Sequence, residues 1–117
     1  MIKAFHDFVA YLENTEDLNL DPQTNRLVHA ALGIGGESGE IVDIIKKAYV
    51  YHKPIDKTAL LEELSDILHY IVMMCNVYEW ALDDVMEFNM AKLKKRYPDG
   101  YSHANALARK DKEVTDD

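Results

Sequence analysis

The chain has 117 residues, 48% of them hydrophobic and 29% charged, and a formal net charge of −8. That length and apolar content suffice for one domain with a core. The acidic charge excludes nucleic acid and anionic membranes as partners for the surface as a whole, and it would also repel a small anionic substrate unless cations intervene.

The first two predicted helices lie on either side of an Asn-, Asp- and Pro-containing interruption. Apolar residues recur every three or four positions over residues 2–13, which predicts an amphipathic helix. Asp21 followed by Pro22 predicts the start of a second helix, which the apolar pattern continues to about Tyr51.

The second predicted helix contains four glycines: Gly33, Gly35, Gly36 and Gly39. Each glycine inside a helix costs roughly 0.5–1 kcal/mol relative to alanine. We therefore expect a neighbouring helix or a ligand to approach the backbone closely here.

Two further helices follow the break at Pro54. Asp56 or Thr58 can cap the third, over residues 57–80, and the fourth begins near Leu82 and is stopped after Tyr97 by Pro98 and Gly100. No segment shows strand periodicity and no repeat is evident. The predicted fold is all-α, like a four-helix bundle, with one domain over residues 1–105 and a polar, flexible tail over residues 106–117.

The sequence also predicts the compartment. Cys75 is the only cysteine, so one chain can form neither a disulfide nor a cysteine-based zinc site. Charged residues interrupt the apolar pattern of the N-terminal segment, which excludes a signal peptide, and the longest uncharged run, residues 67–78, is too short to span a bilayer. We expect a soluble, cytoplasmic protein with no membrane partner.

Two pairs of carboxylates stand out. Glu37 and Glu40 lie three residues apart on the second predicted helix, and Glu63 and Asp66 lie three apart on the third. Residues with this spacing share a helix face, so the pairs can face each other across a helical hairpin. Four converging carboxylates repel one another unless cations lie between them, and an all-oxygen set suits Mg²⁺ or Mn²⁺ better than zinc or copper.

Most carboxylate pairs of this kind belong to a solvated helix surface. Position favours a metal site here, because Glu37 interrupts an apolar stripe while Glu63 and Asp66 flank Leu64 and Ile67. The spacing to Asp66 selects Glu63 rather than Glu62 as the ligand.

Three segments in order, "GESGE" (36–40), "EELSDILHY" (62–70) and "NMAKLKKRYPDGYS" (89–102), resemble the MazG-like branch of the all-α NTP pyrophosphohydrolases. That family's signature is E-x-x-E followed by E-x-x-D, and here residues 41–62 separate the two elements. The downstream N-x-x-K-L-x-x-R-Y-P element is also present. The resemblance covers about residues 25–105.

The resemblance implies the reaction and the residues that perform it. A nucleoside triphosphate, NTP or dNTP, would be hydrolysed to the monophosphate and pyrophosphate with Mg²⁺, for which Mn²⁺ could substitute. The metal ligands would be Glu37, Glu40, Glu63 and Asp66, with Glu37 also acting as the catalytic base. Candidates for contact with the sugar or the phosphates are Asn89 and Lys92, followed by Lys46, Lys47 and Arg96.

The resemblance also suggests a homodimer or a dimer-of-dimers tetramer, with the base pocket completed by a neighbouring subunit. Short helical hairpins bury little surface by themselves, which favours the same assembly. The family often carries tryptophan where His69 stands in this sequence. His69 and His29 could contact the base or be structural, and Trp80 is more typical of a packing residue.

Two other functions remain open. Asp66 and His69 superficially resemble the Glu-x-x-His element of di-iron carboxylate bundles, but that architecture requires the element twice. A non-catalytic helical dimerisation or adaptor module, with its acidic face on a basic partner, is the other alternative. The "GIGG" segment is not a phosphate-binding loop, because no Gly-Lys-Ser/Thr follows it.

Overall fold

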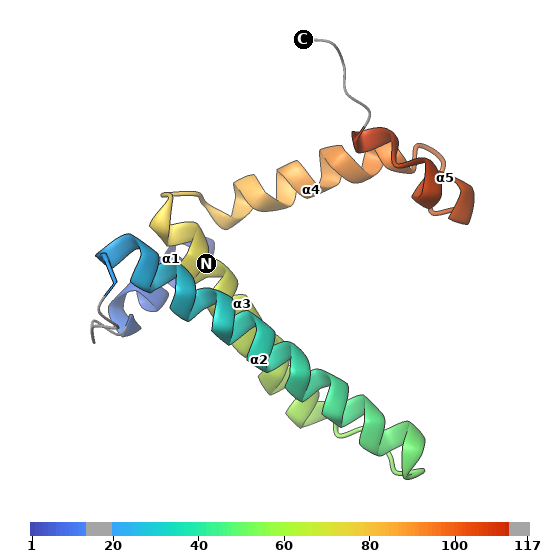
Figure 1. The fold of residues 1–117 in the computed structure, drawn as a ribbon, viewed down its shortest axis with the longest axis horizontal. Coiled ribbons are helices and arrows are strands. Elements are labelled where there is room, and N and C mark those ends of the chain that lie inside the picture. Colours follow the sequence, from blue (N-terminus) through green and yellow to red (C-terminus); the bar gives the residue numbers. More distant parts are fainter. Residues whose placement is uncertain (14–19, 113–117) are drawn as a thin grey trace. The chain divides into compact units, whose positions relative to one another are not determined.

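The computed structural model describes residues 1–13 and 20–112. They form α1 (Ile2–Leu12), α2 (Pro22–Val50), α3 (Lys57–Val77), α4 (Leu82–Arg96) and α5 (His103–Ala108), followed by the 3₁₀ helix η1 (Lys110–Lys112) (Figure 1). These residues contain no β-strand, which confirms the predicted all-α fold. No helix among them is both long and apolar enough to cross a membrane.

The helix starts agree with the capping residues in the sequence. The carboxylate of Asp21 accepts a hydrogen bond from the amide of Thr24 at 3.0 Å, and Pro22 occupies the first turn of α2. Asp56 caps α3 in the same way, through the amide of Ala59 at 3.0 Å. Each cap satisfies an amide that the helix itself leaves unpaired, so it fixes where the helix begins.

The chain divides into two compact units, Met1–Ala81 and Leu82–Asp117. The predicted domain boundary at residue 105 falls inside α5, a short helix that the sequence pattern did not predict. The predicted polar tail therefore begins with helical residues, and its residues 113–117 lie outside the described part of the chain.

In the first unit, α2 and α3 lie side by side as an antiparallel hairpin, and α1 packs against α3 (Figure 1). Val9 of α1 and Val72 of α3 are fully buried, and Cys75 of α3 is also buried. The side-chain amide of Asn76 donates to the backbone carbonyl of His6 at 3.2 Å, which ties α1 to α3.

In the second unit, α4 carries acidic residues in its first turn and Lys94, Lys95 and Arg96 in its last turn. This distribution complements the helix dipole at both ends. Arg96 makes two hydrogen bonds to the carboxylate of Asp111, of 2.6 and 2.9 Å, and these hold η1 against α4.

Candidate metal centre

Three of the four predicted metal ligands meet between α2 and α3. Carboxylate oxygens of Glu37, Glu63 and Asp66 all lie within 4.8 Å of one another. The short connection between the helices makes them antiparallel, so the E-x-x-E and E-x-x-D segments come to the same level of the hairpin. Glu37 and Glu63 are half-buried, and Asp66 is exposed.

Glu63 is the most perturbed member of this cluster. Its Oε2 atom is buried and has no hydrogen-bond partner. A hydrogen bond with Glu37, burial, and the negative charges of Glu37, Glu40 and Asp66 together raise the pKa of Glu63 to about 7. Without a cation, a proton on Glu63 removes one negative charge and so relieves part of the repulsion.

The cluster fits a hard divalent cation. Its members offer only carboxylate oxygens, and no histidine or cysteine belongs to the group among the described residues. Such a set suits Mg²⁺ or Mn²⁺. A cation would also give the buried Oε2 atom of Glu63 the partner that it lacks, since buried polar atoms are rarely left unsatisfied.

Glu40, the fourth predicted ligand, is exposed and does not belong to this three-carboxylate group. Its negative charge still raises the pKa of Glu63 on α3 and the pKa of Lys47 on α2, so it contributes to the electrostatics of both helices. Glu62 is exposed and also outside the group.

The glycine-rich part of α2 has one close contact. A Cβ atom on Gly33 would lie 2.4 Å from the ring of Tyr70 on α3, so the expected close approach of a neighbouring helix is confirmed at this position. A Cβ atom on Gly35, Gly36 or Gly39 would meet nothing within 4 Å. No neighbouring part of the described chain explains those three glycines.

Both candidate histidines contact the ring of Tyr70. Its centroid lies 5.8 Å from that of His29 and 5.3 Å from that of His69, which meets it edge-on. Trp80 stacks on Tyr78 at 4.9 Å. In this structure the three residues therefore pack against other aromatic rings, which is the structural alternative that the sequence left open.

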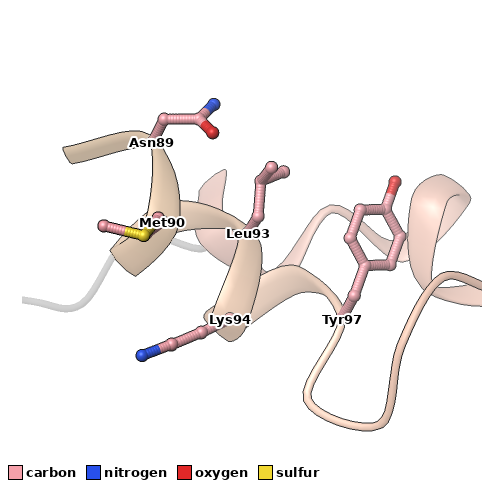
Figure 2. A pocket seen from close by; sticks show the side chains of 5 residues that line it. All are labelled: Asn89, Met90, Leu93, Lys94 and Tyr97. Carbon is pink, nitrogen blue, oxygen red and sulfur yellow. The ribbon is translucent and has the colours of Figure 1, made fainter. Parts of the chain in front are cut away.

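The two leading substrate-contact candidates, Asn89 and Lys92, lie on α4 in the second unit and line different open pockets. Asn89 and Leu93 of α4 and Tyr97, the residue after its end, project to the same side and line a pocket to which Met90 and Lys94 also contribute (Figure 2). Lys92 lines another pocket, with Lys95, Lys112 and apolar side chains of α4.

The remaining basic candidates have carboxylate neighbours. Lys47 pairs with Asp43 at 2.8 Å, one turn away on α2, and Lys46 contributes its charge to the same carboxylate. Arg96 pairs with Asp111, whose side chain is 1% exposed. Hydrogen bonds from Arg96 lower the pKa of Asp111.

Sequence reasoning missed two contacts. Asp111 belongs to a polar segment that gave no sign of pairing with Arg96. Tyr70 lies seven residues after Glu63 and four after Asp66, which puts it on the ligand-bearing face of α3, so helix periodicity could have indicated its place near Gly33.

The comparisons with known proteins gave one finding. The family model described as the MazG nucleotide pyrophosphohydrolase domain matches residues 26–101, well over half of the chain. Neither the search of curated proteins nor the search of solved structures produced a match. The matched range includes the whole carboxylate cluster and all of α4.

Proposed function

The chain belongs to the MazG nucleotide pyrophosphohydrolase family, and from this premise we propose that it hydrolyses a nucleoside triphosphate, NTP or dNTP, to the monophosphate and pyrophosphate. The proposed cofactor is Mg²⁺, for which Mn²⁺ can substitute. The observation that carries the proposal is the convergence of Glu37, Glu63 and Asp66 within the family-matched region. The buried, unpartnered Oε2 atom of Glu63 supports a cation there.

We assign the metal to Glu37, Glu40, Glu63 and Asp66. When bound, the ion supplies positive charge that neutralises the triphosphate and polarises its phosphoryl oxygens. This accounts for how a chain with a net charge of −8 accepts an anionic substrate. Glu40 is exposed, so its side chain has the freedom to turn toward the cluster.

Glu37 is the proposed base. It takes the proton of the attacking water as the oxygen bonds to phosphorus, the bond between the α- and β-phosphates breaks, and pyrophosphate leaves. Glu37 hydrogen-bonds Glu63, whose pKa is raised to about 7, so Glu63 can hold a proton beside the proposed base.

Asn89 and Lys92 are the proposed contacts to sugar and phosphate, with Lys46, Lys47 and Arg96 as further phosphate contacts. Lys47 and Arg96 each hold a carboxylate in this structure, so phosphate oxygens would have to replace those partners. Phosphate and carboxylate present similar oxygen pairs to a guanidinium, which makes the exchange feasible at Arg96.

The exposed apolar residues of the hairpin support the proposed homodimer or dimer-of-dimers tetramer. They recur with spacings of three and four on each helix, and we call them the apolar face: Val42, Ile45, Tyr49, Leu61, Leu64 and Leu68. On a helical wheel, at 100° per residue, the apolar residues of α2 lie on the same rotational side of Glu37 as those of α3 lie of Glu63. Because the two helices are antiparallel and these glutamates face each other, both groups of apolar residues lie on one side of the hairpin. The opposite side carries Glu40, Asp43, Lys47, Glu62 and Asp66.

Within the first unit α1 covers only the end of α3 around Val72 and leaves Leu61 and Leu64 68% and 52% exposed. A contiguous apolar surface of this kind marks an interaction site. We expect light scattering to give a dimer or tetramer, and Leu64→Glu to shift it toward a monomer. A monomeric wild-type protein would overturn the assembly.

The first experiment is pyrophosphate release from a panel of canonical and modified NTPs and dNTPs, with Mg²⁺, with Mn²⁺ and with EDTA. Metal-dependent release by the wild-type protein, with a loss of 100-fold or more in Glu63→Gln and Glu40→Gln, supports the proposal. Glu62→Gln is the matched control, because Glu62 is exposed and outside the cluster, and it should retain activity.

A protein that cleaves no nucleotide with either metal would contradict the proposal and favour the non-catalytic adaptor function. Stoichiometric iron in the purified protein would instead revive the di-iron bundle.

A further inference from the structure

The contact between Gly33 and Tyr70 joins α2 and α3 close to the carboxylate cluster. Gly33 lies one helical turn before Glu37, and Tyr70 lies one turn after Asp66. The Tyr70 ring lies so close to α2 that a Cβ atom on residue 33 would approach its Cγ, Cδ1 and Cδ2 atoms to 2.4–2.6 Å. The helices can come this close only because residue 33 has no side chain.

The ring has little freedom to move away. The ring centroid of His29, one turn before Gly33 on α2, lies 5.8 Å from the centroid of the Tyr70 ring. The ring of His69 meets the Tyr70 ring edge-on, with 5.3 Å between the centroids. The atoms that a Cβ would strike include Cγ, at the base of the ring, which a small rotation about the ring axis does not displace. Relief of the clash therefore requires a change of the Tyr70 rotamer or a separation of the helices.

From this geometry we propose that Gly33 and Tyr70 are positioning residues, which set the separation of α2 and α3 and so hold Glu37 at metal-binding distance from Glu63 and Asp66. The inference rests on the proposed metal centre and adds to it the residues that determine the distance between the ligands on α2 and those on α3. Neither Gly33 nor the Tyr70 ring needs to touch the ion or the substrate.

The size of the effect follows from the distances. Carbon atoms in contact normally lie about 3.5–4.0 Å apart, so an added methyl group at residue 33 must be relieved by a shift of roughly 1 Å. Ligands must be held to within about 0.5 Å of their working positions. Mg²⁺ demands near-ideal octahedral geometry with short bonds, whereas Ca²⁺ accepts longer and more variable ones.

The test measures ion affinity rather than activity. Mn²⁺ binding is followed by electron paramagnetic resonance, and Mg²⁺ and Ca²⁺ are used as competitors, with helicity checked by circular dichroism. Gly33→Ala should lower Mn²⁺ and Mg²⁺ affinity by about tenfold or more and Ca²⁺ affinity by less. A change in the preference between ions separates positioning from a general loss of stability, which would weaken all three together.

Two variants control the result. Gly36→Ala adds the same methyl group next to Glu37, where it would meet nothing within 4 Å, and should bind all three ions like the wild-type protein. Gly33→Ala combined with Tyr70→Ala removes the Cγ, Cδ1 and Cδ2 atoms that the added methyl group would strike and should recover most of the Mg²⁺ affinity. If Gly33→Ala alone fails to fold, the double variant decides, because it should fold and bind.

The outcomes are distinguishable. A wild-type protein that binds no Mn²⁺ overturns the metal centre and the inference with it. If the wild-type protein binds the ions, the inference alone is overturned by any of three results. These are unchanged affinities in folded Gly33→Ala, an equal loss in Gly36→Ala, and a folded double variant that does not recover.

Discussion

The pH dependence of metal binding offers a direct test of the carboxylate cluster. A metal ligand must be ionised, so a proton on Glu63 competes with the ion. Because Glu37, burial and the neighbouring charges raise the pKa of Glu63 to about 7, this competition begins near neutral pH. An ordinary glutamate, with a pKa of 4.5, would be ionised over the whole range from pH 6 to pH 8.

The magnitude follows from the pKa. At pH 5, two units below a pKa of about 7, roughly 1% of Glu63 is ionised, against roughly 90% at pH 8. The apparent affinity for Mg²⁺ or Mn²⁺ should therefore fall by about 100-fold between pH 8 and pH 5, close to tenfold for each unit below 7. With an unperturbed glutamate the fall would be less than about twofold.

Isothermal titration calorimetry with Mn²⁺, in paired buffers of different ionisation enthalpy, measures both the affinity and the protons released. At pH 6 the wild-type protein should release about one proton for each ion bound. Glu63→Gln should bind weakly and release no such proton, whereas Glu62→Gln should follow the wild-type profile. A wild-type affinity that changes less than about twofold from pH 8 to pH 5 would refute the reasoning.

Three further predictions concern stability. The pKa of Glu63 is about 7 in the folded chain, above the ordinary glutamate value of 4.5, so the stability gained by protonating Glu63 is complete below pH 4.5 and is lost as the pH rises through 7. The urea midpoint of metal-free protein should thus fall from pH 5 to pH 8 and recover with Mg²⁺ at pH 8, and a constant midpoint would contradict this. Val72→Ala should lower the free energy of unfolding by about 1.5–3 kcal/mol, because the Val72 side chain of α3 is fully buried. A wild-type melting curve would show that this core is not formed. Gly35→Ala should raise the free energy of unfolding by about 0.5–1 kcal/mol, since its methyl group would meet nothing within 4 Å, and a loss of stability in urea would mean that another surface contacts Gly35.

The sequence by itself determined the four longest helices and the residue types of the candidate site, but not α5. Capping and helix periodicity are local properties, so Asp21 with Pro22, and the pair Asp56 or Thr58, were enough to place the starts of α2 and α3. The structure selects Asp56 as the cap of α3. The i, i+3 spacing of carboxylates on two helices joined by a short connection predicted that four carboxylates would converge. Three of them, Glu37, Glu63 and Asp66, do so in the structure, and Glu40 lies outside the group.

The tertiary structure alone decided how these groups act on one another. Burial of one oxygen of Glu63 and its hydrogen bond with Glu37 depend on how far apart α2 and α3 lie, which no spacing within a single helix specifies. The same holds for the glycines. All four interrupt the helix alike in the sequence, but only Gly33 lies beneath a ring of the neighbouring helix, because helix packing, not local propensity, brings Tyr70 over it.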